Sequence, residues 1–133
     1  MKNRLLATAI AASFFVIPGA HAMTRAEYKV EKEKIEADYK VSKTKCDALS
    51  GNAKDVCMKE AKGAENVAKA ELENAYKPSP SHARKVEEEK VAMRYDVAKE
   101  KCDSLQGDAK DACVSQAKAN RDKAKANIQV TKH

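Results

Sequence analysis

The stretch KCDALSGNAKDVC, from Lys45 to Cys57, returns as KCDSLQGDAKDAC, from Lys101 to Cys113. Each copy holds two cysteines with ten residues between them. A gapless comparison of residues 29–62 with residues 85–118 gives 19 identities in 34 positions. The chain is therefore an internal duplication, and its fold is expected to be one structural unit used twice.

Helical spacing on both sides of the repeated stretch predicts two helices joined by a tight turn. In the first copy, Thr24 and Glu27 form a capping-box pattern that starts a helix. Gly51 stands where a helix ends in a left-handed residue, and Asn52 follows as the predicted N-cap of the next helix. Asp108 takes the same role in the second copy. The first helix carries an apolar stripe at Tyr28, Ile35, Tyr39, Cys46 and Leu49, and a weaker stripe roughly opposite at Val30, Ala37, Val41 and Ala48.

The predicted fold class is all-α: two tandem disulfide-stapled antiparallel helical hairpins, arranged as a four-helix up-down bundle. The hairpins cover residues 23–76 and residues 82–133. Residues 77–81 contain two prolines and two serines, which do not continue a helix, so they form the predicted linker. The alternative is that the hairpins stay extended about this linker. The bundle is favoured because each hairpin alone buries little apolar surface.

The first 22 residues have the pattern of a cleaved signal peptide. Lys2 and Arg4 precede an uncharged apolar run over residues 5–17, and residues 20–22 (AHA) supply a small-x-small cleavage site. The apolar run is shorter than the roughly 20 residues of a spanning helix, so we expect no transmembrane segment after cleavage. No cysteine lies at the cleavage point, which argues against a lipoprotein. The sequence therefore predicts a periplasmic or secreted bacterial protein that begins at Met23.

The four cysteines are expected to form disulfides, because export leads to an oxidising compartment. Four cysteines allow three pairings. Cys46 and Cys57 lie at nearly the same height above the turn, on facing apolar stripes, so we favour a Cys46–Cys57 bond. The same argument favours Cys102–Cys113. A structural zinc site needs cysteines two to four residues apart and a redox dithiol needs C-x-x-C, so both alternatives are disfavoured.

Composition and motifs exclude most kinds of catalysis. Without residues 1–22 the chain has neither Phe nor Trp, so it can bury only a thin core that the disulfides would reinforce. Its remaining histidines, His82 and His133, lack a partner arrangement for acid–base work. No phosphate loop, nucleophile elbow or metal-binding motif is present. We therefore expect a protein that is not an enzyme and that has no cofactor and no metal site.

The positive charge of the chain is concentrated near its C-terminus. The formal net charge is +6, and removal of Lys2 and Arg4 leaves +4. Residues 23–117 contain 19 basic and 19 acidic side chains, so the whole excess lies in residues 118–133. Such a segment could contact anionic lipid headgroups, peptidoglycan or another acidic polymer. Nucleic acid is disfavoured by the exported location and by the lack of an aromatic stacking platform. The candidate contacts to an anionic surface are Lys118, Arg121, Lys123, Lys125 and Lys132.

The twin motif C-D-x-L-x-G-[ND]-A-K-D-x-C, with A-E-Y-K at residues 26–29 and A-Y-K-P at residues 75–78, resembles a group of small exported proteobacterial proteins. Some of them carry the label of a TolA-like cell-envelope protein. The resemblance implies a helical, envelope-located protein and adds no catalytic residue. We expect a non-enzymatic periplasmic interaction or envelope-stress protein that contacts a protein or an envelope component. The alternatives are binding of an anionic surface through residues 118–133 and chaperone-like binding of unfolded clients.

Overall fold

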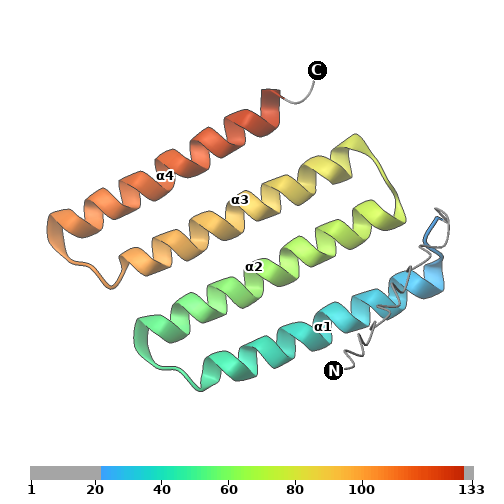
Figure 1. The fold of residues 1–133 in the computed structure, drawn as a ribbon, viewed down its shortest axis with the longest axis horizontal. Coiled ribbons are helices and arrows are strands. Elements are labelled where there is room, and N and C mark those ends of the chain that lie inside the picture. Colours follow the sequence, from blue (N-terminus) through green and yellow to red (C-terminus); the bar gives the residue numbers. More distant parts are fainter. Residues whose placement is uncertain (1–21, 131–133) are drawn as a thin grey trace, which may run out of the picture.

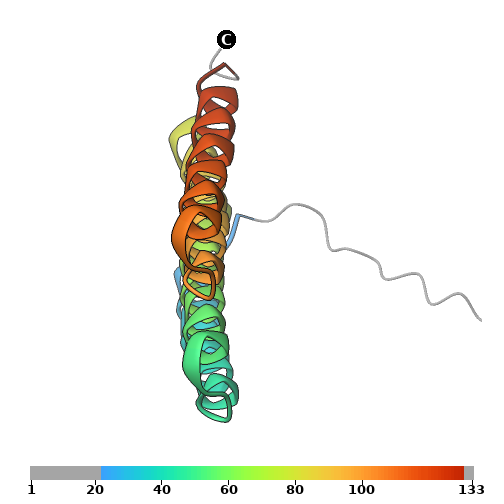
Figure 2. The same cartoon turned by 90° about the vertical axis from the view of Figure 1, so that its left-hand side faces the viewer.

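A computed structural model describes residues 22–130 of the chain. They form four α-helices and no strand: α1 (Arg25–Asp47), α2 (Gly51–Tyr76), α3 (Pro80–Cys102) and α4 (Gly107–Val130). Consecutive helices run antiparallel, as Figure 1 shows, and the view turned by 90° in Figure 2 shows a layer one helix thick. The predicted all-α fold of two antiparallel hairpins is confirmed.

The two hairpins pack together through α2 and α3, in the up-and-down order of a helical bundle. The bundle is open, because α1 and α4 make no contact in the described part of the chain. The reason lies in α2, which has small residues on two opposite sides. Cys57 and Ala61 lie against α1, whereas Gly63 and Ala70 lie toward α3. A helix with two opposite contact faces separates its neighbours and does not direct them to a common centre.

The capping box that starts α1 is confirmed. The backbone N–H of Thr24 donates to the Glu27 carboxylate over 2.7 Å, and the N–H of Glu27 donates to the Thr24 hydroxyl over 3.2 Å. These two bonds satisfy N–H groups that have no partner within the helix.

The helix after each turn starts two residues earlier than predicted. Gly51 and Gly107 both have a φ of +58°, the left-handed value that glycine adopts without strain. Each of these glycines is the first residue of its helix, and Ser50 is the N-cap of α2. The prediction of Asn52 and Asp108 as N-caps is therefore wrong. Asn52 instead donates from its side-chain amide to the carbonyl of Glu100 in α3, over 2.8 Å.

The connection between the hairpins is shorter than the predicted linker of residues 77–81. α2 ends at Tyr76 and α3 begins at Pro80, so only residues 77–79 lie outside the helices. Ser79 caps α3 by accepting from the backbone N–H of His82 over 3.0 Å. Pro80 takes the first helical position. Proline lacks a backbone N–H, and this costs nothing here because an N–H at this position has no acceptor within the helix.

The core is thin, and it follows the seams between neighbouring helices. Cys46 and Cys102 are fully buried, at 0% exposure. Leu49 and Leu105 are 45% and 41% exposed, although the sequence placed Leu49 on the apolar stripe. They lie in the turns, because α1 and α3 end before them. The other buried apolar residues are Ala61, Ala70, Leu72, Val86, Val91 and Ala117.

Candidate functional site

The repeated stretch forms the turn of each hairpin, and both predicted disulfides are present. Cys46 is bonded to Cys57 and Cys102 to Cys113, with Cα–Cα distances of 5.4 Å and 5.6 Å. The chain therefore has no free cysteine. In residues 22–130, no group of three or more His, Cys, Asp or Glu side chains is arranged to hold a metal ion.

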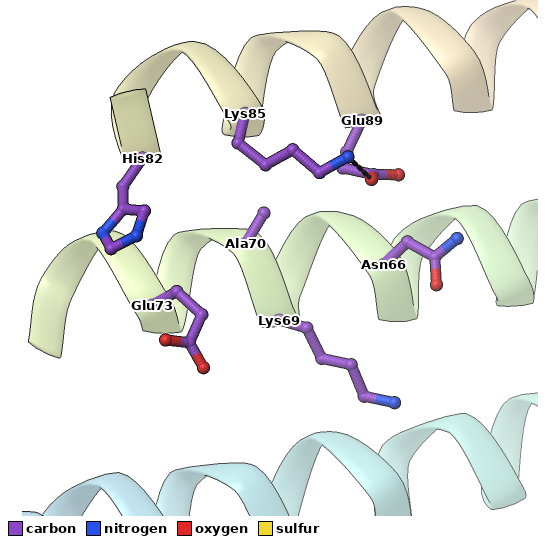
Figure 3. A pocket seen from close by; sticks show the side chains of 7 residues that line it. All are labelled: Asn66, Lys69, Ala70, Glu73, His82, Lys85 and Glu89. Atoms are coloured by element: carbon purple, nitrogen blue, oxygen red, sulfur yellow. Dashed lines mark ion pairs between the residues drawn. The ribbon is translucent and has the colours of Figure 1, made fainter. Parts of the chain in front are cut away.

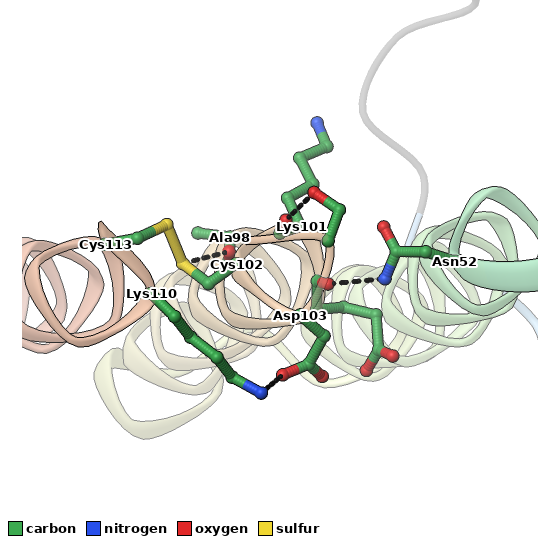
Figure 4. Close-up of polar contacts among 9 residues, drawn as sticks. Asn52, Ala98, Lys101, Cys102, Asp103, Lys110 and Cys113 are labelled. Carbon is green, nitrogen blue, oxygen red and sulfur yellow. Dashed lines mark hydrogen bonds and ion pairs between the residues drawn. A yellow bond between two sulfur atoms is a disulfide. The ribbon is translucent and has the colours of Figure 1, made fainter. Parts of the chain in front are cut away.

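The two turns share an ion pair as well as a disulfide. Lys54 contacts Asp47 over 3.1 Å in the first copy, and Lys110 contacts Asp103 over 3.0 Å in the second. Figure 4 shows the second turn with its disulfide, its ion pair and the hydrogen bond from Asn52 that reaches α3 from the neighbouring hairpin. Because the same groups recur at both turns, the repeated stretch acts as a structural unit.

A shallow groove between α2 and α3 is a candidate for a binding site. It has a volume of about 450 Å³, and Figure 3 shows its lining side chains. Both signs of charge line it, with one imidazole and one amide, so it suits a polar or charged group. The lining residues are Asn66, Lys69, Ala70, Glu73, His82, Lys85 and Glu89.

The charged groups of this groove have partners within the chain. Lys85 contacts Glu89 over 2.8 Å, and Glu73 accepts a hydrogen bond from the Tyr28 hydroxyl. The hydrogen bond and the charge of Glu89 raise the pKa of Lys85. A lysine that acts as a nucleophile needs the opposite shift. The His82 Nδ1 lies 2.6 Å from the carbonyl of Lys77. The groove therefore offers paired charges for contact and no activated nucleophile.

Glu65, on α2, is a buried acid that the sequence analysis did not identify. Its side chain is 5% exposed, and its two oxygens accept from Lys62 over 2.8 Å and from Lys69 over 2.7 Å. Burial raises the pKa of Glu65, but the hydrogen bonds and charges of the two lysines outweigh it and hold the pKa below its ordinary value. The sequence did contain a signal for this buried acid. Glu65 lies seven residues before Leu72, on the same side of the helix, and lysines stand three residues before Glu65 and four residues after it.

Cation–aromatic contacts recur in both hairpins. The Lys62 ammonium lies 5.3 Å from the ring centre of Tyr39, and the Arg121 guanidinium lies 4.4 Å from that of Tyr95. Tyr39 and Tyr95 are equivalent positions of the repeat, so each hairpin places a cation of its second helix over a tyrosine of its first. The contact stabilises each hairpin in its middle, away from the disulfide.

The basic residues predicted to contact an anionic surface do not form one patch. Arg121 is directed to Tyr95 and contacts Asp122 over 2.9 Å. Lys118 and Lys125 are exposed and seven residues apart, so they share one side of α4. Lys123 is exposed on a different side, and Lys132 lies outside the described residues.

Comparison with protein-family models, with curated proteins and with solved structures gives no match for this chain. Within residues 22–130, no helix combines the length and the apolar character needed to cross a membrane. The predicted signal peptide lies almost entirely in residues 1–21, outside the described part of the chain.

Proposed function

We propose that this protein is a non-enzymatic, exported interaction protein of the bacterial cell envelope, which presents the charged faces of a disulfide-stapled helical layer to a protein or envelope partner. The observation that supports this most is the open layer itself. Its groove is shallow and its charges are already paired, which suits contact with another surface better than chemistry on a small substrate.

Export is proposed on two grounds. The first 22 residues have the signal-peptide pattern, and both pairs of cysteines form disulfides, which persist in oxidising compartments such as the periplasm. Expression of the full chain in a bacterium, followed by fractionation and intact-mass measurement, tests this. The expected product is periplasmic, begins at Met23 and is four hydrogens lighter than the thiol form. A cytoplasmic full-length chain with free thiols contradicts the proposal.

Site-specific photo-cross-linking in living cells tests the interaction. A photoreactive residue at Lys85 samples the groove side of α3, and one at Glu87 samples the opposite side, because two helix positions differ by about 200°. Mass spectrometry of the adducts then identifies the cross-linked molecules. A reproducible envelope component at either position supports the proposal. Adducts with copies of this chain only, or no adduct, contradict it.

Binding of an anionic surface is the second candidate, and the exposed pair Lys118 and Lys125 on one side of α4 favours it. Sedimentation with phosphatidylglycerol vesicles tests this candidate. The double change Lys118→Gln with Lys125→Gln should abolish co-sedimentation, whereas the control Lys123→Gln on another side of α4 should leave most of it. Equal binding by all variants removes the candidate.

A further inference from the structure

The outer edge of α1 carries an apolar stripe that no other helix covers in the described residues. Val30 is 62% exposed and Val41 is 54% exposed, with the exposed Ala37 between them. This stripe lies on the side of α1 opposite Cys46, which faces α2. In the second copy of the repeat, the residue equivalent to Val30 is Val86, which is 7% exposed. The same stripe is therefore open in one copy and buried in the other.

In the second copy, α2 covers this stripe. Met93 of α3, equivalent to Ala37, lies directly against Gly63 of α2. Ion pairs flank this contact on both sides, from Lys90 to Glu71 at 3.6 Å and from Lys101 to Glu60 at 3.9 Å. The α2·α3 seam thus joins the second helix of one repeat to the first helix of the next. By the duplication, α4 is the copy of α2 and α1 is the copy of α3.

We propose that copies of this protein pack head to tail, with α1 of one copy against α4 of the next, in the geometry by which α3 packs against α2 within the chain. The two edge helices, α1 and α4, lie on opposite sides of the layer (Figure 1), and each runs antiparallel to its inner neighbour. An added copy therefore continues the same layer, and the contact between copies is continuous with an interface that already exists.

At the two free edges, the residues equivalent to the closest contact of the internal seam differ in size in a compensating way. Internally, Gly63 makes room for Met93, and a Cβ at Gly63 would collide with the Met93 side chain. At the edges, the equivalent of Gly63 is Ala119 on α4, and the equivalent of Met93 is Ala37 on α1. Compared with the internal seam, the α4 edge therefore has one more Cβ, and the α1 edge has a much shorter side chain. The two differences compensate in volume, as close packing requires.

A head-to-tail contact uses two different surfaces, so each assembly retains one free α1 edge and one free α4 edge. This separates the proposal from a symmetric dimer of two α1 edges, and edge-blocking variants test the difference. Val30→Glu with Val41→Glu blocks the α1 edge, and Ala119→Glu with Ala126→Glu blocks the α4 edge. All four positions are exposed, so both variants should keep the helical circular dichroism of the wild type.

Sedimentation velocity of the mature, oxidised protein over a hundredfold concentration range gives the readout. The wild type should increase in mass with concentration beyond two copies, and each blocked variant alone should stay monomeric. An equimolar mixture of the two variants should form a dimer, because each supplies the edge that the other lacks. A wild type that remains monomeric throughout, a dimer that the α4 variant leaves intact, or a mixture that stays monomeric overturns the proposal.

Discussion

Loss of one disulfide should remove a large part of the stability of this protein. Each disulfide joins cysteines 11 residues apart. In the chain-entropy model, closing a loop of this size stabilises the folded state by about 2.8 kcal/mol. Globular domains are stable by about 5–15 kcal/mol in total, and the core here is thin. We therefore expect Cys102→Ala with Cys113→Ala to lower the free energy of unfolding by about 3 kcal/mol.

Urea unfolding followed by far-ultraviolet circular dichroism measures this loss. The matched variant Cys46→Ala with Cys57→Ala should lose a similar amount, because its loop has the same length. Wild type reduced with a phosphine keeps all four side chains and lacks both links, so it should lose about twice as much. The comparison of reduced wild type with the alanine variants separates the cross-link from the packing of the buried Cys46 and Cys102.

The reasoning is refuted if reduced wild type unfolds at the same urea concentration as the oxidised protein. Such a result means that the seams between helices alone hold the layer, and that the repeated stretch is not its main stabilising element. A loss confined to the alanine variants, with none in reduced wild type, contradicts the cross-link argument and assigns the effect to packing.

Three other predictions address single contacts. Gly63→Ala should destabilise the protein by about 1–3 kcal/mol in urea unfolding because its Cβ collides with Met93, although alanine in a helix is normally about 1 kcal/mol more favourable than glycine. Adding Met93→Ala should restore much of the lost stability. An unchanged or increased stability of Gly63→Ala contradicts the close contact. The lowered pKa of Glu65 gives stability that is present above about pH 4.3 and is lost as the pH falls through the lower folded-state pKa. Glu65→Gln should therefore reduce the loss of stability on the acid side of the pH profile. A profile identical to that of the wild type argues against the ion pairs of Glu65 with Lys62 and Lys69. The hydrogen bond to Glu73 raises the pKa of Tyr28, so the absorbance at 295 nm that Tyr28→Phe removes should titrate above pH 10, and Glu73→Gln should lower that midpoint.

Much of the architecture could be predicted from the sequence because the duplication supplies the same information twice. The four helices, the left-handed Gly51 and Gly107, and both disulfides follow from local patterns that recur at the same offset. The capping box at Thr24 is local in the same sense. A capping box is formed by neighbouring residues alone, so the sequence was sufficient for it, whereas the N-caps predicted at Asn52 and Asp108 were wrong.

The open form of the layer and the candidate site depend on pairs that are distant in sequence. Helical spacing did not reveal that Gly63 and Ala70 form a second contact side of α2. The hydrogen bond from Asn52 to α3 was missed for the same reason, since its acceptor lies 48 residues away. The groove between α2 and α3 exists only because the hairpins pack through those sides.

The distance between α1 and α4 tests the account most directly. Spin labels on non-canonical residues at Lys40 and Lys118, both exposed, leave the four cysteines intact, and dilution with unlabelled protein restricts the measurement to one copy. Packed helices lie about 8–10 Å apart, so the open layer predicts a separation of about 24–30 Å across three helix spacings. A main distance of about 10–15 Å, which a closed bundle with α1 beside α4 would give, contradicts the account.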